Sequence, residues 1–169
     1  FHILSSKLLK FGATCTDDPL CTKFPTCSAG ATTTLTGKVY APNGVEPLYN
    51  ALVYVPHGAV APFATTLTCD RCETSGTKKA FAQAVSAPDG TFTLKNIPAG
   101  TDIPLVIELG KWRRVTKVNV TACTANTAPA ANTRLPKKQA EGDPLDNIPK
   151  IALATGTIDQ LECVLRKIG

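Results

Sequence analysis

The chain has 169 residues and a net charge of +5, with 18 % charged, 6 % aromatic and 43 % hydrophobic residues. This length can bury the core of one domain, and the hydrophobic content excludes a chain that is disordered throughout. The basic residues are scattered apart from positions 111–114 and 137–138, so nucleic-acid binding is not indicated. No run of about 18 apolar residues occurs, so no membrane span is expected.

Seven Cys residues without a clear metal or catalytic signature indicate an oxidising compartment, and we expect the protein to be secreted or held at the cell surface. The lack of Met and the Phe at position 1 predict a processed product or a fragment of a longer precursor, from which we expect a signal peptide to have been removed. Because the number of Cys is odd, at least one has no partner within the chain. The disulfide candidates are Cys15, Cys21, Cys27, Cys69, Cys72, Cys123 and Cys163.

Residues 1–30 are expected to form an irregular N-terminal arm stapled by disulfides, because their three Cys alternate with Pro and Gly. The first eleven residues are apolar but fit neither a clean helix nor a clean strand. They either pack on their own domain or reach a neighbouring subunit as an added strand. The apolar residues of this assembly arm are Phe1, Ile3, Leu4, Leu8, Leu9 and Phe11.

Residues 31–121 carry short apolar or alternating segments separated by turns, of which Asp89-Gly90 is a typical hairpin signal. A long insertion at 56–79 interrupts this region. About seven strands with no helical period between them predict an antiparallel β-sandwich. The expected strands lie at 32–40, 51–55, 80–86, 91–94, 103–109 and 111–120.

Residues 122–169 differ from the rest. The segment 121–136 is rich in Thr, Ala, Asn and Pro, which predicts a loop or strap over the sandwich. Further on, Thr157 and Gln160 have capping-box spacing, and apolar residues then recur at helical intervals up to Gly169. We therefore expect one amphipathic helix at the C-terminal end.

Three stretches of the β region together form a recognisable pattern. They are LTGKVY through NG to ALVYV at 35–55, APDGTFTL with IPAG at 87–100, and LVIELG at 105–110 with a closing strand to Val120. This pattern resembles the carboxypeptidase regulatory-like domain over residues 33–121. The resemblance implies a transthyretin-like (prealbumin-like) seven-strand sandwich that accompanies enzymes and surface proteins and has no active site of its own.

The flanking motifs CDRC at 69–72, GKWRR at 110–114 and LECVLRKIG at 161–169 are similar to those of secreted proteins of myxobacteria and related environmental bacteria. The chain departs from the plain regulatory-like domain by its insertion, its Cys-rich start and its C-terminal helix. These departures are where we expect its own function to lie.

The pair Cys69-x-x-Cys72 has three interpretations: a structural disulfide, half of a metal site, or a redox pair. Its Thr/Gly-rich surroundings favour the disulfide, and the remaining Cys and the two His do not supply an evident second pair of ligands. Cys123 and Cys163 flank the tail, so we expect a bridge between them that ties the closing helix to the last strand.

No catalytic constellation is evident. A hydrolytic triad needs a base with an orienting partner, and the chain has two His, one of them next to the first residue. It also lacks the zinc-protease helix motif and a phosphate-binding glycine loop. We therefore expect a protein that is not an enzyme and needs no cofactor.

Two surface sites remain candidates. Trp112 with Arg113 and Arg114 could contact a sugar or an acidic group, if these side chains are exposed on their strand. The competing interpretation is a Trp that covers the edge of the sandwich among solvated Arg residues. Asn119-Val120-Thr121 is a glycosylation sequon.

Taken together, these features predict a non-catalytic extracellular structural protein, a subunit of a filament or surface layer that assembles through its apolar arm and strand edges. Its partner would be further copies of the chain. The alternative is a carbohydrate- or protein-binding accessory domain of a larger secreted enzyme, with a glycan or a cell-surface partner. A sugar-binding face would need Trp112 exposed beside a second aromatic such as Tyr49 or Tyr54.

Overall fold

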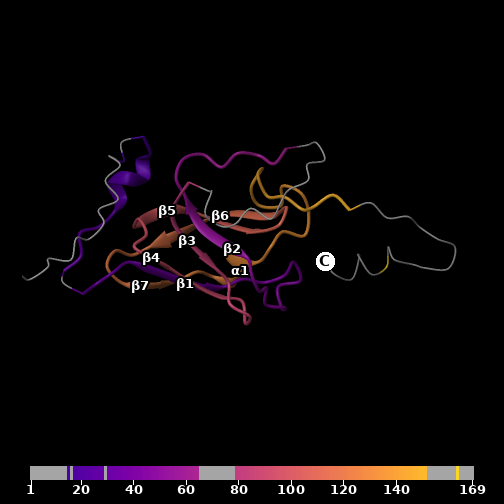
Figure 1. The fold of residues 1–169 in the computed structure, drawn as a ribbon, viewed down its shortest axis with the longest axis horizontal. Helices are drawn as coiled ribbons and strands as arrows, with labels where there is room; N and C mark the ends of the chain where they lie inside the picture. Colours follow the sequence, from indigo (N-terminus) through magenta and orange to yellow (C-terminus); the bar gives the residue numbers. More distant parts are fainter. Residues whose placement is uncertain (1–14, 16, 29, 65–78, 152–162, 164–169) are drawn as a thin grey trace, which may run out of the picture.

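The structure is a computed structural model that describes residues 15, 17–28, 30–64, 79–151 and 163 (Figure 1). This part of the chain is mainly β. Its elements in chain order are the 3-10 turn η1 (Pro19–Lys23), β1 (Thr34–Lys38), β2 (Leu52–Pro56), β3 (Ala80–Val85), β4 (Thr91–Lys95), β5 (Gly100–Leu109), β6 (Trp112–Val120), β7 (Ala125–Thr127) and the short helix α1 (Ala130–Thr133).

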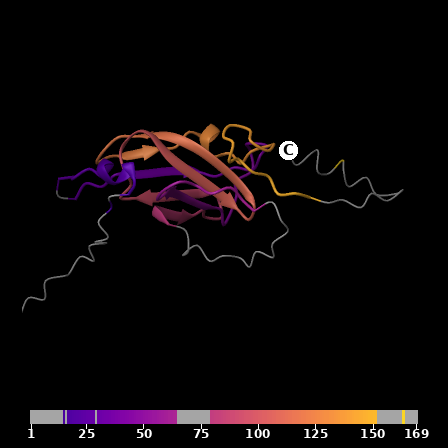
Figure 2. The same ribbon diagram turned by 90° about the horizontal axis from the view of Figure 1, so that it is seen from above.

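The strands form two sheets. One has three strands in the order β4-β1-β7, and the other has four in the order β3-β2-β5-β6. Figure 2 shows the strands in two layers. Buried residues of both sheets belong to one hydrophobic core, which includes Leu35 and Phe92 from one sheet and Val53, Leu105 and Ile107 from the other. Burial of this apolar surface is the main term that stabilises the fold.

The burial patterns explain why these segments form strands. β4 alternates strictly between exposed and buried residues, as expected for a strand that covers the core with one face. β2 and the second half of β5 are buried on nearly every residue, because their sheet is covered on both faces. The turn before β4 uses Gly90 with φ of +81°, and a Cβ there would lie 2.8 Å from the carbonyl oxygen of Val39. Only glycine fits this turn without strain.

All six strand ranges expected from the sequence contain a strand. The seventh strand, β7, lies in the 121–136 segment for which we predicted a loop or strap. It runs parallel to β1, so the expectation of a wholly antiparallel fold is wrong for this pair and the three-stranded sheet is mixed. The Asn126 side-chain amide supports the pairing, because it donates to the carbonyl of Thr34 in β1 and also to the carbonyls of Thr121 and Thr124 in the turn before β7.

Two expected features fall outside the described residues. The C-terminal helix lies there except for Cys163, which is exposed, and so does most of the 56–79 insertion. Within the part of the chain that the structure describes, no helix has the length and apolar character needed to cross a bilayer.

Candidate assembly surface and the polar network beside it

The outer strand of the four-stranded sheet is uncharged. β3 has the sequence AFAQAV, and among the described residues it pairs with β2 only. Ser86 donates its backbone N–H to Ala51 on the β2 side, so by alternation the amide of Gln83 points away from β2. The side chains of Gln83 and Val85 are exposed. Soluble proteins commonly protect edge strands with charges or proline, and β3 carries neither.

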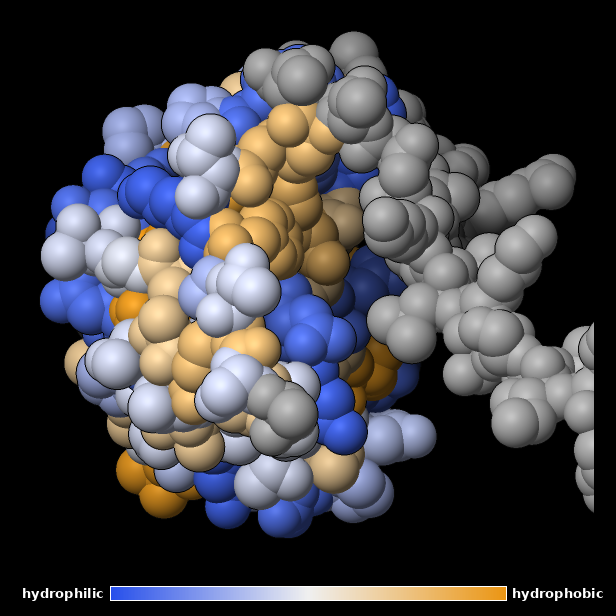
Figure 3. Space-filling model, turned by 90° about the vertical axis from the view of Figure 1, so that its left-hand side faces the viewer, coloured by the Kyte–Doolittle hydropathy of each residue, from blue (hydrophilic) through white to orange (hydrophobic). Residues whose placement is uncertain are grey.

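Apolar surface continues from β3 to the N-terminal segment. The ring of Phe24 is 39 % exposed and meets the ring of Phe81 edge-on, with centroids 5.3 Å apart. Phe24 also lines a cavity of about 230 Å³ together with Ile97 and Cys27. Figure 3 shows apolar residues gathered on the end of the molecule that carries η1.

The opposite edge of the same sheet is covered by the chain itself. The backbone of Arg113 exchanges two hydrogen bonds of 2.9 Å with Asn147. Val115 donates its backbone N–H to Asp146, and Lys117 accepts a hydrogen bond from the side chain of Asn132. These outward backbone groups of β6 are therefore already used, and a further strand cannot pair with them.

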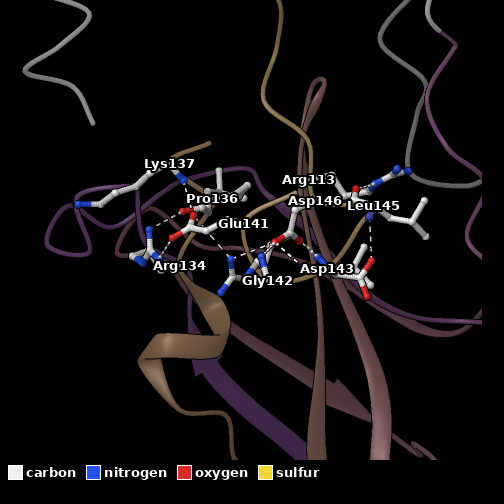
Figure 4. A network of polar contacts seen from close by, with 12 residues as sticks. Arg113, Arg134, Pro136, Lys137, Glu141, Gly142, Asp143, Leu145 and Asp146 are labelled. Carbon is white, nitrogen blue, oxygen red and sulfur yellow. Dashed lines mark hydrogen bonds and ion pairs between the residues drawn. The ribbon is translucent and has the colours of Figure 1, made fainter. Parts of the chain in front are cut away.

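A buried carboxylate anchors this covering segment. Asp146 is fully buried and accepts hydrogen bonds from the Val115 amide at 2.7 Å, the Gly142 amide at 2.9 Å and Arg114 at 3.1 Å (Figure 4). The Asp143 amide adds a longer bond of 3.3 Å. A charge that has been removed from water is stable only with such partners, so Asp146 fixes residues 142–147 against β6.

A second carboxylate extends the network. Glu141 accepts from the Arg134 guanidinium at 2.7 Å and from the Lys137 amide at 2.6 Å, and Arg114 lies 3.8 Å from it. Burial raises the pKa of Glu141, but the hydrogen bonds from Arg134 and Lys137 outweigh it, so the pKa lies below its ordinary value. The ionised Glu141 carboxylate thus connects Arg134 and Lys137 to Arg114 of β6.

A third polar group lies on the face of the four-stranded sheet that is turned away from the shared core. The Tyr54 hydroxyl donates to Glu108 at 2.9 Å, and the guanidinium of Arg113 lies 3.9 Å from the same oxygen. All three side chains are buried. Burial and then the neighbouring Glu108 charge raise the pKa of Tyr54. Tyr54 therefore donates to Glu108 as a neutral hydroxyl.

Arg113 holds two loops over this face. It donates to the carbonyls of Leu145 at 3.0 Å and Ala61 at 2.8 Å, and its guanidinium lies 4.1 Å from the ring centroid of Phe63. The loop after β2 and the tail thereby exclude water from Glu108. This arrangement was not predicted from the sequence, although a signal was present. Glu108 and Arg113 flank a tight turn at Gly110, where antiparallel pairing places them opposite each other.

The predicted ligand contact at Trp112, Arg113 and Arg114 is wrong for Arg113, which is 3 % exposed. Trp112 packs against the core, and its indole N–H donates to the carbonyl of Pro136 at 2.9 Å. Arg114 is only 13 % exposed and is bound to Asp146. Since Tyr54 is also buried, Trp112 and Tyr54 do not form an exposed aromatic pair, whereas Tyr49 is 62 % exposed.

The disulfides differ from the expected pairing. Cys123 is bonded to Cys27, not to Cys163, and a second disulfide joins Cys15 to Cys21. The expectation for Cys123 is wrong because the turn after β6 brings it to the N-terminal segment, where the Cys123 amide also donates to Thr33. Two disulfides are typical of a protein in an oxidising environment.

A mixed group of side chains also gathers beside η1. Cys15, Asp17, Cys21 and His57 each offer a ligand atom, and these atoms lie within 4.8 Å of one another. The sequence suggests metal binding only at Cys69 and Cys72 and does not associate His57 with the first two Cys. No sequence pattern links them, because His57 comes from the loop after β2.

Other predicted site residues are placed as follows. Asn119 is exposed on β6, so its sequon is accessible. The assembly arm, residues 1–11, and the pair Cys69 and Cys72 lie outside the described residues.

Comparison of the chain with models of protein families gives no match, and comparison with curated proteins gives none either.

Proposed function

We propose that the chain is a non-catalytic extracellular structural protein, a subunit of a filament or surface layer that assembles by pairing strand edges and docking its apolar N-terminal arm. The single observation that carries this proposal is the asymmetry of the four-stranded sheet. The chain uses its own tail to cover β6, but no strand among the described residues pairs with the outer edge of the uncharged strand β3.

We further propose that the two sheets form a transthyretin-like sandwich of the carboxypeptidase regulatory-like kind, exported from the cell. The sheets of three and four strands, the shared core and the two disulfides support this. The buried carboxylates and Arg residues of this protein hold loops in place, which is a structural use of those groups.

Edge pairing explains how copies would join. A strand added beside β3 would form backbone hydrogen bonds with the outward amide of Gln83 and cover the exposed side chain of Val85. The apolar arm at residues 1–11 supplies a segment of suitable character in the next copy. Phe24 and Phe81 extend the surface available to it.

The test begins with native secreted material, examined by electron microscopy and by mass analysis without reducing agent. Ordered polymers are expected, with residues 1–11 protected from protease. A chain lacking residues 1–11 is expected to stay folded and monomeric. If the shortened chain polymerises normally, the arm has no role and the proposal is wrong.

Point variants test the edge directly. Gln83→Lys places a charge on β3, and Gln83→Pro removes the outward amide while leaving the ladder with β2 intact. Both are expected to abolish polymers. Val45→Lys is the matched control, because Val45 is 75 % exposed in a turn away from any strand edge. Equal polymer yields from the Gln83 variants and the control would refute the edge model. A discrete wild-type monomer that binds glycans would instead support the accessory-domain alternative.

A further inference from the structure

The group beside η1 is held by contacts independent of any ligand. Asp18 accepts from the Leu20 amide at 2.7 Å with one carboxylate oxygen and from the Gly58 amide at 2.5 Å with the other. It thus fastens the segment that carries Cys15 and Cys21 to the loop that carries His57. Leu20 is buried in the hydrophobic core and holds η1 against it. The segment that carries Cys15, Asp17 and Cys21 is therefore attached to the loop that carries His57.

His57 is held in place as well. Its backbone amide donates to Lys79 at 3.0 Å, and its ring lies 4.7 Å from the ring of Phe81, centroid to centroid. The imidazole Nε2 then points at the group, 3.8 Å from Cys15 Sγ and 3.5 Å from Asp17 Oδ1. An imidazole braced in this way loses little conformational entropy when it binds a ligand.

The donor set is that of a zinc-type site. Two Cys sulfurs, one imidazole nitrogen and one carboxylate oxygen are the ligands that Zn²⁺ takes in tetrahedral geometry. Zinc–ligand distances of about 2.0–2.3 Å place neighbouring ligand atoms about 3.3–3.8 Å apart. The separations of 3.8 Å and 3.5 Å around His57 Nε2 already have these values. Sulfur ligands favour such a cation over Mg²⁺ or Ca²⁺.

The two sulfurs are bonded to each other in the structure. Two thiol molecules, or one phosphine with one water molecule, must first supply two electrons and two protons, which break the S–S bond and give the two Cys thiols. The thiols leave as a disulfide, and the phosphine leaves as a phosphine oxide that carries the oxygen of the water. Zn²⁺ then displaces the two thiol protons as the thiolates bind it. Cys15 is exposed, so this disulfide is open to attack.

We propose that Cys15, Asp17, Cys21 and His57 form a redox-controlled site for zinc or a similar divalent cation, closed by the Cys15–Cys21 disulfide and opened by reduction. The proposal goes beyond the structural function above and does not depend on it. The Cys15–Cys21 disulfide joins two residues of the segment around η1, whereas the bound cation would join that segment to the loop after β2 through His57.

The experiment uses the full chain and a phosphine reductant, with Zn²⁺ or Co²⁺ as the added metal. Native mass spectrometry is expected to show one metal per chain at this site after reduction and none before. Co²⁺ should give the thiolate charge-transfer band and the intense visible bands of a tetrahedral complex. Alkylation followed by peptide mapping should find Cys15 and Cys21 protected by the metal.

Variants separate this site from the other Cys pair. Cys15→Ser with Cys21→Ser should abolish the Co²⁺ thiolate band, and His57→Ala, which keeps every Cys, should weaken Zn²⁺ binding about tenfold or more. Cys69→Ser with Cys72→Ser is the matched control and should keep the site intact. Trp112 fluorescence confirms that each variant is folded. No metal uptake on reduction, unchanged affinity in His57→Ala, or loss of uptake only in the Cys69/Cys72 control would each overturn the proposal.

Discussion

Replacement of Asp146 by Ala should detach the covering segment from β6. The carboxylate is fully buried and accepts four hydrogen bonds, of which those from the Val115 amide and Arg114 cannot be replaced by water without opening the contact. Each buried donor left without an acceptor costs about 1–3 kcal/mol, and breaking a buried ion pair by removing one partner costs about 3–5 kcal/mol. Because Gly142 is exposed and can turn to solvent, we expect a total of about 3–5 kcal/mol.

Asp143→Ala is the matched control, because the Asp143 side chain accepts one hydrogen bond, from the Leu145 amide, and should cost about 1 kcal/mol. Urea unfolding with intact disulfides, followed by fluorescence of the single Trp, measures both variants. The indole of Trp112 contacts Pro136 and reports on the tail directly. If Asp146→Ala and Asp143→Ala differ by less than about 1 kcal/mol, the buried carboxylate does not anchor the tail in the way described.

Two further predictions concern the cross-links and the buried hydroxyl. Cys27→Ser with Cys123→Ser should lower the free energy of unfolding by about 2–5 kcal/mol. This loss should exceed the loss caused by removing the Cys15–Cys21 disulfide, since the two disulfides have sequence separations of 96 and 6. Equal losses in urea titrations would contradict this entropic argument. Because the pKa of Tyr54 is raised in the folded chain, its contribution to stability is complete below the ordinary tyrosine value near 10 and falls as the pH rises above it. Tyr54→Phe should therefore flatten the alkaline side of the stability curve measured by urea unfolding, and an unchanged slope above pH 10 would show that Tyr54 is not responsible.

The strands were predictable because their signals are local. The alternation in β4 and the Asp89-Gly90 turn follow from residue type and near neighbours alone. β7 was not predictable in this way, since Ala125–Thr127 has no apolar alternation and its pairing depends on backbone bonds to the distant β1 and on the bond from Asn126 to Thr34. Such a strand leaves no periodic trace in the sequence.

The candidate sites depended on distant contacts, and there the sequence was a weaker guide. Cys27 meets Cys123 across 96 positions, and no spacing rule selects that partner. In the sequence Arg113 resembles a solvated surface residue, but in the structure the loop containing Ala61 covers it. The apolar character of β3 was visible in the sequence, but its place at the edge followed only from the sheet order.

The Cys27–Cys123 disulfide also determines how the protein would carry mechanical load. Tension applied to the chain before Cys27 and after Cys123 passes directly across the covalent bond. Strands β1 to β6 lie between the two Cys, so they stay out of the line of force. The enclosed 96-position separation corresponds to about 320 Å of extended chain that cannot be drawn out while the bond is intact. A subunit pulled through the segments before Cys27 and after Cys123 would thus resist stretching without relying on the hydrogen bonds of its sheets.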